Sequence, residues 1–156
     1  MPKAARSQAN RPEELFLVSD LKAFLEGMWK LERSLEDGIR DETGALIGEA
    51  RFVTADGGLD YREEGMLSLG DHRGAAHQAY RYDFPTPGRA AVSFTDGRFF
   101  HDLDLTAGIW TCRHRCGDDD YAGEFRALNA DLLRVLWRVK GPRKDTLLDG
   151  LYRRVG

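Results

Sequence analysis

The chain is poor in cysteine, the residue that staples many small domains. Of its 156 residues only two are cysteines, Cys112 and Cys116. If both lie on one strand, their Cα atoms are about 13 Å apart, whereas a disulfide needs Cα atoms within about 7 Å. We therefore expect no intrachain bridge. Reduced thiols are typical of the cytoplasm, which is the location that the sequence predicts.

Long apolar runs and an excess of positive charge are missing too. No run approaches the roughly 20 apolar residues that cross a bilayer. The formal net charge is −3, whereas nucleic-acid binders normally carry a strong basic excess. Residues 1–10 are polar and basic with no apolar stretch, so a signal peptide is not expected. We predict a disordered tail over residues 1–11, one domain over residues 12–156, and neither a membrane nor a nucleic-acid partner.

Helical patterns are nearly absent as well. Leu21, Phe24 and Leu25 have the spacing of one apolar helix face. Ser19 and Asp20 precede them as capping residues, and Gly27 follows as a terminator. Such a short amphipathic helix must cover something, and we expect it to cap one end of the β domain that follows.

Beyond Gly27 the apolar spacing changes to two, the period of a half-buried strand. Turn residues separate ten such segments, near residues 29–35, 46–53, 59–69, 75–84, 90–94, 99–105, 109–116, 121–128, 132–139 and 146–155. No segment offers the helical crossover that parallel strands require. The pattern predicts an all-β, mainly antiparallel fold, a closed up-and-down barrel of about eight to ten strands, because closure removes exposed strand edges.

Two terminal features support this fold by resemblance. The run Gly27-Met28-Trp29 resembles the Gly-x-Trp signature of lipocalins and their calycin relatives. In that superfamily the tryptophan packs against an arginine late in the last strand, which implies Arg154 here, with Arg153 as the alternate. A guanidinium stacked on an indole would close one barrel end. The expected closure residues are Gly27, Trp29, Tyr152 and Arg154.

A second resemblance covers most of the chain. Residues 61–65, 94–101, 114–116 and 141–145, together with Asp119, Tyr121, Tyr152 and Arg154, are similar to a bacterial family known only as a domain of unknown function. That family is assigned a calycin (lipocalin-like) β-barrel. The resemblance implies the fold and implies no reaction.

One carboxylate falls on an apolar strand face. Glu63 shares its face with Tyr61 and Leu67, so period two points it into the barrel. A buried carboxylate needs a partner or a raised pKa. Glu63 could anchor a ligand or act as a general acid or base. The favoured interpretation is a structural salt bridge to an inward arginine such as Arg33 or Arg81.

Two histidines are placed similarly. His101 and His114 lie on mostly apolar faces of successive strands, and both are expected to point inward. Adjacent antiparallel strands could bring the two rings together. A hydrogen-bonded core histidine is the favoured interpretation of each, but Glu63, His101 and His114 are the candidate catalytic residues.

The run Cys112-x-His114-x-Cys116 invites a comparison with metal sites. Neighbouring ligands on one strand are about 6.6 Å apart and could chelate, but the two cysteines cannot both reach one Zn²⁺. A zinc site would need a further ligand such as His101, and haem held by one histidine is another alternative. We predict no metal and no cofactor, with zinc and haem as the alternatives.

Three functions fit a barrel of this kind. No nucleophile elbow, dinucleotide fingerprint or Ser-His-Asp spacing is found. The first hypothesis is a monomeric or weakly dimeric barrel that binds a small amphiphilic or aromatic ligand. Its candidate ligand-binding residues are Tyr61, Glu63, Tyr80, Arg81, Tyr82, Phe99, His101, Trp110, His114, Cys116, Tyr121, Phe125 and Trp137.

The other two hypotheses differ in what the interior does. One is an enzyme that uses Glu63 with His101 or His114 as an acid/base pair in the lumen. The other is a structural or interaction barrel with a filled core. The sequence leaves open whether the protein is an enzyme, and a lumen packed shut by side chains would favour the third hypothesis.

Overall fold

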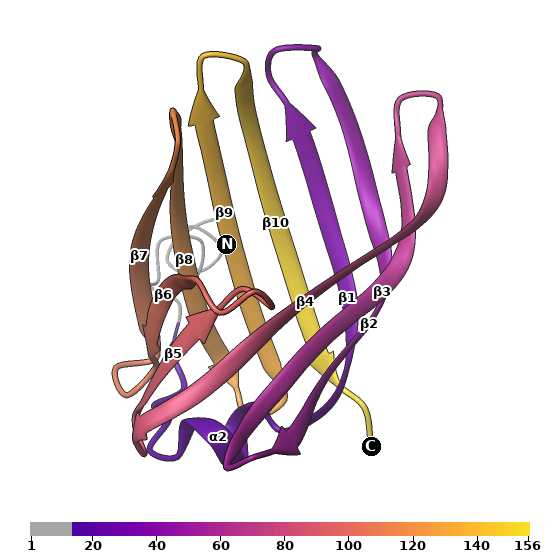
Figure 1. The fold of residues 1–156 in the computed structure, drawn as a ribbon. Coiled ribbons are helices and arrows are strands. Elements are labelled where there is room, and N and C mark those ends of the chain that lie inside the picture. The colour runs from indigo at the N-terminus through magenta and orange to yellow at the C-terminus, as the bar shows by residue number, and fades with distance from the viewer. Residues whose placement is uncertain (1–13) are drawn as a thin grey trace, which may run out of the picture.

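The computed structural model describes residues 14–156 and contains ten strands (Figure 1). Along these strands, more buried and more exposed side chains tend to alternate with a period of two. The tail expected over residues 1–11 lies outside the described residues. Within them the elements are α2 (Leu21–Leu25), β1 (Gly27–Asp37), β2 (Glu42–Ala55), β3 (Gly58–Leu69), β4 (His72–Thr86), β5 (Arg89–Ser93), β6 (Phe99–Asp104), β7 (Ile109–Cys116), β8 (Asp119–Asn129), β9 (Leu132–Gly141) and β10 (Lys144–Arg154).

The strands form one antiparallel sheet in the order β6-β5-β4-β3-β2-β1-β10-β9-β8-β7. Every sequence neighbour is paired except β6 with β7, and the first strand pairs with the last. The β1–β10 ladder runs from Trp29 opposite Arg154 to Asp37 opposite Thr146. The predicted all-β, up-and-down barrel with a short helix is confirmed.

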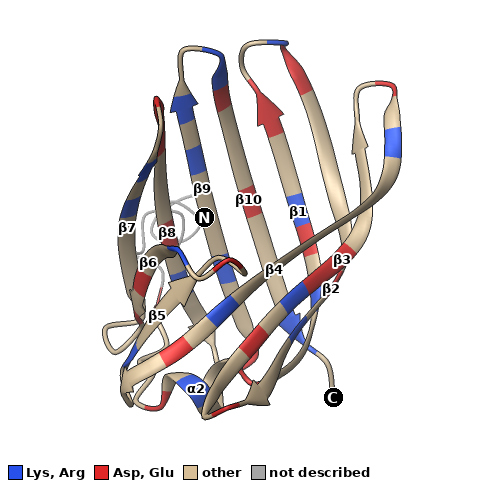
Figure 2. Cartoon of the chain, viewed as in Figure 1, with Lys and Arg blue, Asp and Glu red and all other residues tan. Residues whose placement is uncertain are grey.

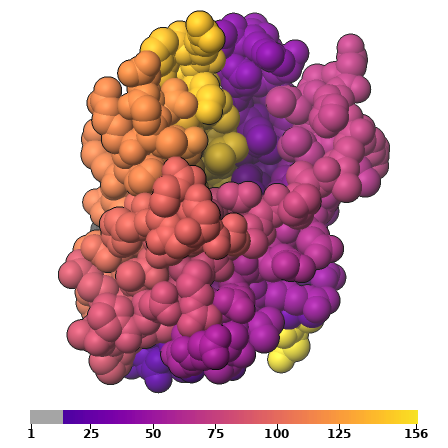
Figure 3. Space-filling model, viewed as in Figure 1, coloured from indigo at the N-terminus to yellow at the C-terminus, as the bar shows by residue number. Residues whose placement is uncertain are grey.

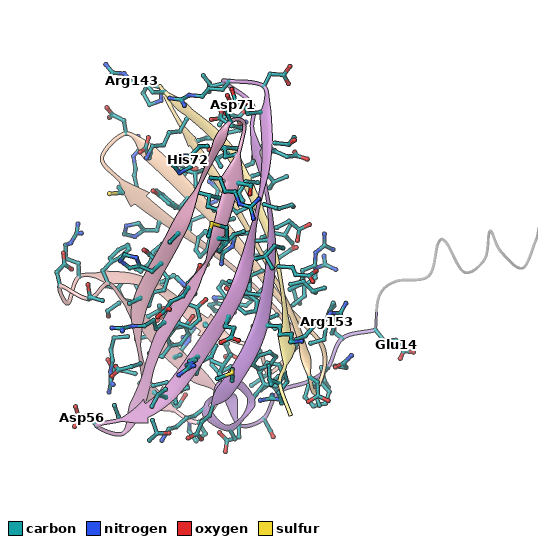
Figure 4. The ribbon with its side chains drawn as sticks, turned by 90° about the vertical axis from the view of Figure 1, so that its right-hand side faces the viewer. Glu14, Asp56, Asp71, His72, Arg143 and Arg153 are labelled. Atoms are coloured by element: carbon teal, nitrogen blue, oxygen red, sulfur yellow. The ribbon has the colours of Figure 1, made fainter. Side chains whose placement is uncertain are left out.

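The two ends of the barrel differ. Short hairpins connect the strands at one end, which we call the open end; Figure 4 labels Asp71, His72 and Arg143 there. The opposite end, which we call the helix end, carries α2 and the β2–β3 turn at Asp56 (Figures 1 and 4). On the side shown in Figure 2, acidic and basic residues are interspersed along the strands, with no face of one sign.

Helix α2 covers the helix end, as expected. The Asp20 carboxylate accepts a hydrogen bond from the Ala23 N–H at 3.1 Å and so caps the first turn. Leu21, Phe24 and Leu25 are buried against the barrel interior. Because a helix of this length is not stable alone in water, its apolar face is what holds it in place.

Trp29 and Arg154 join the helix to both terminal strands. The Trp29 indole is fully buried, and its Nε1–H donates to the Leu25 carbonyl at 2.9 Å. The guanidinium carbon of Arg154, not Arg153, lies 4.3 Å from the centroid of this indole. Arg154 Nη2 donates to the carbonyls of Phe24 and Ala130, at 2.6 and 3.0 Å. A planar guanidinium can stack and donate at once, so one side chain ties α2, β1, β10 and the β8–β9 turn together.

The barrel is nearly closed rather than fully closed, because no ladder joins β6 to β7. We call this junction the seam. At the helix end it is held by main-chain bonds from the segment before α2, where the Phe16 N–H donates to Ala127 O at 2.8 Å and the Val18 N–H donates to Leu105 O at 3.0 Å. Above these bonds, the Trp110 Nε1–H donates to the Asp102 carbonyl at 2.7 Å.

The cause of the seam lies in β5 and β6, which have only five and six residues. Register shifts occur between Asp83 and Thr86 on β4 and between Val92 and Ser93 on β5. Such bulges bend a strand and interrupt its ladder. Short, bulged strands therefore leave the sheet one pairing short of closure.

The junction at Arg154 makes a testable prediction. Arg154→Lys keeps the charge but loses the planar stack and most of the carbonyl bonds. We expect the free energy of unfolding to fall by about 1–3 kcal/mol. Urea denaturation of both proteins measures this difference.

Arg153→Lys is the matched control, because Arg153 is exposed on the same strand (Figure 4). It should change stability by less than about 0.5 kcal/mol. Equal losses in the two variants would contradict the role assigned to Arg154.

Candidate functional site: a cavity in the open half of the barrel

Side chains fill the helix half of the barrel completely. Trp29, Leu31, Leu59, Val92 and Leu103 are each at most 1% exposed and pack with α2 into one apolar cluster. Toward the open end the lining residues Leu35, Leu67 and Leu148 are only partly buried. The interior is therefore a solid core at one end and a cavity at the other.

The cavity has a volume of about 320 Å³. It is lined mainly by apolar and aromatic side chains: Arg33, Leu35, Leu46, Tyr61, Glu63, Leu67, Ala76, His77, Gln78, Tyr80, Tyr82, Phe100, His101, Phe125, Val135, Trp137, Leu148 and Tyr152. Figure 3 shows a hollow on the open half, with the yellow of β10 and the purple of β1 and β2 visible at its bottom. The cavity thus connects to solvent on this side.

Aromatic rings form one wall of the cavity. Phe100 stacks on Trp137 with ring centroids 5.0 Å apart and planes 16° from parallel. Phe94 also stacks on Phe100 at 4.6 Å, and Tyr80 lies tilted against the Phe100 ring at 5.5 Å. Gly123 makes room for the indole, because a Cβ at that position would come within 2.7 Å of the Trp137 ring. Phe100 is thus buried among rings, and the partly buried Trp137 and Tyr80 give the wall its exposed aromatic surface.

The floor of the cavity is a polar ring of four side chains. Arg33 holds Glu63 with two bonds, Nη1 to Oε2 at 2.7 Å and Nη2 to Oε1 at 3.0 Å. Arg33 Nη2 also donates to the Tyr152 hydroxyl at 3.0 Å. The Tyr61 hydroxyl donates to Glu63 Oε1 at 2.6 Å and lies 3.0 Å from the Tyr152 hydroxyl.

Proton counting fixes the direction of each bond in this ring. An ionised carboxylate only accepts, so Tyr61 spends its one hydroxyl proton on Glu63. Tyr152 must then donate to Tyr61. Burial raises the pKa of both phenols, that of Tyr61 well above its usual range, so both stay protonated at neutral pH. Both carboxylate oxygens and both hydroxyls therefore have a partner within the ring.

His101 has a defined tautomer. Its Nδ1 lies 2.8 Å from the Asp102 carbonyl, which can only accept, so Nδ1 carries the proton. The ring is 3% exposed, and burial lowers its pKa to about 4. At neutral pH the imidazole is uncharged, and Nε2 is a free acceptor with no hydrogen bond to the described part of the chain.

The Tyr80 hydroxyl supplies a hydrogen-bond donor to the same cavity. Gln78 Nε2 donates to the Tyr80 oxygen at 2.8 Å, which leaves the hydroxyl proton unused among residues 14–156. Burial raises the pKa of this phenol, so the proton is retained. An aromatic cavity with one free acceptor and one free donor is a site that can orient a small molecule.

Comparison with known proteins identifies the family but not a ligand. The chain matches the family of unknown function DUF6314 over residues 25–154. It belongs to the DUF6314 family. No curated protein matches the chain.

Solved structures similar to this DUF6314 protein include the S-type phycobiliprotein lyase CPES of Guillardia theta, with 10% identity and a TM-score of 0.61 over 86% of this chain and 90% of the lyase. A de novo designed fluorescence-activating barrel shows 14% identity and a TM-score of 0.48, over 88% and 100% of the two chains. A DUF3598 protein of unknown function from Nostoc punctiforme shows 13% identity and a TM-score of 0.48, over 94% and 53%. At these identities the likeness shows the fold alone.

Seven of the residues proposed from sequence line the cavity of this DUF6314 protein: Tyr61, Glu63, Tyr80, Tyr82, His101, Phe125 and Trp137. Glu63 has the arginine partner that was favoured, and the partner is Arg33 rather than Arg81. Tyr152, expected only at the barrel closure, also contributes its hydroxyl to the cavity floor.

Three sequence candidates do not line the cavity: Arg81 and Phe99 point outward, and Cys116 lies at the exposed end of its strand, so their placement in the lining was wrong. Arg81 alternates with Tyr80 and Tyr82, and it forms ion pairs with Asp60 and Asp83 on the outer face. Phe99 is 55% exposed because β6 carries an extra residue, Phe100, where its register with β5 shifts, and this reverses the alternation. Cys116 is exposed at the end of β7, beside the β7–β8 hairpin.

Three further candidates lie beside the cavity without lining it. Trp110 bridges the seam, while His114 and Tyr121 pack edge-on around Phe100 at 5.2 and 6.2 Å. The expected meeting of His101 and His114 does not occur, because β6 and β7 are unpaired and both rings lie against the intervening Phe100. Phe100, which sequence reasoning missed, is thus the central ring of this wall.

Cys112 and Cys116 are free thiols. Burial raises the pKa of Cys112 to about 11, so this thiol is protonated at neutral pH. Among the described residues, no group of three or more His, Cys, Asp or Glu side chains is arranged to hold a metal ion. Residues 14–156 also contain no helix long and apolar enough to span a membrane.

The Arg33–Glu63 pair makes a stability prediction. Glu63→Gln leaves the Arg33 charge buried without its counter-charge, and we expect the free energy of unfolding to fall by about 3–5 kcal/mol. The double variant Arg33→Met/Glu63→Leu removes both charges and should regain most of that loss. Denaturant titration of the single and double variants measures the coupling; losses that simply add would contradict it.

His101 makes a prediction about pH. The unfolded chain takes up the proton near pH 6.5 and the folded chain only near pH 4, so the stabilising effect is complete above pH 6.5 and is lost as the pH falls toward 4. His101→Leu removes this dependence. Between pH 7 and pH 4 the wild type should therefore lose roughly 3 kcal/mol more unfolding free energy than the variant. Parallel stability curves for the two proteins would show that the imidazole is not buried as described.

Proposed function

We propose that this DUF6314 protein binds a small, largely aromatic molecule in the open half of its barrel. The observation that carries the proposal is the cavity of about 320 Å³. Ligand sites are typically apolar cavities of about 300–1,000 Å³ with a few placed polar groups. This cavity has that composition and falls at the small end of the range.

The partial exposure of apolar side chains in the lining supports this function. Leu35, Leu67, Trp137 and Leu148 line the cavity and are only partly buried. Covering apolar surface stabilises a complex by about 25 cal/mol for each Å² removed from water. A ligand that fills the open half would supply the cover that α2 supplies at the helix end.

The acid/base alternative finds less support in the geometry. Both oxygens of Glu63 already accept hydrogen bonds from Arg33 or Tyr61, so the carboxylate is engaged within the floor. His101 makes no hydrogen bond to Glu63, because its only bond within residues 14–156 goes to the Asp102 carbonyl. A general acid/base pair needs mutual or substrate-mediated hydrogen-bond reach, and the groups are occupied elsewhere.

The filled-barrel alternative is disfavoured by the cavity itself. Cytoplasmic location and a monomeric or weakly dimeric state stay predictions of the sequence. The shared fold with the phycobiliprotein lyase adds no ligand chemistry at 10% identity, so that chemistry has to come from the lining residues.

Ligand binding is tested with N-phenyl-1-naphthylamine, an uncharged aromatic probe whose fluorescence rises when it leaves water. We expect saturable binding to the wild type. Ala76→Phe projects a ring into the cavity and should weaken binding at least about tenfold. Fluorescence titration measures both affinities, and circular dichroism verifies that the variant is folded.

Ala75→Phe is the matched control, because Ala75 is exposed on the outer face of the same strand. It should leave the affinity within about twofold of the wild type. Absence of saturable binding to the wild type, or equal weakening in both variants, would overturn the proposal.

A further inference from the structure

We propose that the cavity selects an uncharged planar ligand carrying an N–H or O–H group, and that Glu63 is the residue that excludes carboxylates. This inference rests on the proposed function and names the ligand class of the same site. It follows from the charges and the free hydrogen-bonding groups of the lining.

The lining contains one buried positive and one buried negative group. Arg33 and Glu63 have side chains that are 18% and 6% exposed, and they pair at 2.7 Å. His101 is uncharged at neutral pH because burial lowers its pKa to about 4. His77, the remaining ionisable imidazole of the lining, is exposed at the rim. The interior as a whole is therefore electrically neutral.

Arg33 has no free pair of parallel N–H groups for a ligand anion, because both Nη2 protons are taken. A carboxylate is recognised best by the two parallel N–H groups of a guanidinium. In this cavity Glu63 already occupies both of those positions on Arg33, and Tyr152 takes a further Nη2 proton. A ligand carboxylate would have to displace Glu63 or lie beside its negative charge in a site that is largely removed from water.

A cationic ligand meets the converse obstacle. The Glu63 charge is compensated by Arg33, and Oε1 also accepts from Tyr61. A second cation beside Arg33 would be repelled without a free carboxylate to hold it. The neutral Arg33–Glu63 pair thus disfavours both anionic and cationic ligands.

The free groups then describe what a ligand must offer. His101 Nε2 is an unprotonated acceptor, so it needs an N–H or O–H on the ligand. The unused Tyr80 hydroxyl proton suits an acceptor such as a carbonyl oxygen. The Trp137 and Tyr80 rings, which line the cavity and are only partly buried, favour a planar ligand body that packs against them.

The test compares two competitors of the same shape, 1-naphthylacetamide and 1-naphthylacetate, as displacers of N-phenyl-1-naphthylamine from the wild type at pH 7.5. The amide and the carboxylate have equal numbers of non-hydrogen atoms and differ in charge. We expect the amide to displace the probe at a concentration at least about tenfold lower than the carboxylate.

Variants then assign the selectivity to Glu63. Glu63→Gln frees the Arg33 charge and should shift the ratio at least about tenfold toward the carboxylate. Arg33→Met/Glu63→Leu, which removes both charges, should keep the preference for the amide. Because Glu63→Gln is expected to be destabilised, Leu67→Lys serves as a second variant. It adds a positive charge to the lining without touching the pair, and Leu67→Gln is its uncharged control.

The outcomes separate this inference from the proposed function. If the probe does not bind the wild type at all, the proposed function fails. If the probe binds but the carboxylate displaces it as well as the amide, or neither competitor displaces it, the ligand class is wrong while binding stands. An unchanged ratio in folded Glu63→Gln would overturn the role of Glu63, and an unchanged ratio in Leu67→Lys would overturn the neutrality of the lining as the basis of selection.

Discussion

The pairing of the first strand with the last is the constraint on which the rest of this barrel depends. Each of the other ladders joins strands that are neighbours in sequence and meet through a short turn, whereas β1 and β10 meet from opposite ends of the domain. Arg154 holds that junction through its stack on Trp29 and its bonds to Phe24 and Ala130. Since β1 and β10 carry Arg33 and Tyr152, the same junction brings together the two sides of the cavity floor.

The polar floor divides the interior into two halves with different physical character. On the helix side, apolar side chains pack without a ligand, and α2 completes that core. On the open side, aromatic rings around the cavity remain partly exposed to solvent. Replacing a buried ion pair by apolar residues is often neutral or stabilising, so stability alone does not explain a salt bridge at this depth. The position of this salt bridge between the core and the cavity instead fits the proposed role in ligand selectivity.

The apolar periodicity of the sequence was sufficient to predict the features that depend on one strand alone. Alternation predicted the inward direction of Glu63 and Tyr61, and the Gly-x-Trp resemblance pointed to Trp29 and Arg154. Features that depend on two strands could not be predicted in this way. The bulge at Phe100 in β6 turned both Phe100 and His101 inward and Phe99 outward, because an extra residue in a strand reverses the alternation beyond it. Arg81 was included among inward residues for its chemistry, although its position between two inward tyrosines already placed it outside.

The seam gives the barrel an uneven resistance to widening. At the helix end, β6 and β8 are tied through the main-chain bonds of Phe16 and Val18, and Trp110 adds a side-chain bond above them. Toward the open end, no ladder bond links the two free strand edges. Separating β7 from β6 at the rim therefore breaks no β-ladder pairing, while separating any other neighbouring strands does. The Arg33–Glu63 floor lies on strands that are laddered on both sides, so the two free strand edges at the seam are separate from it.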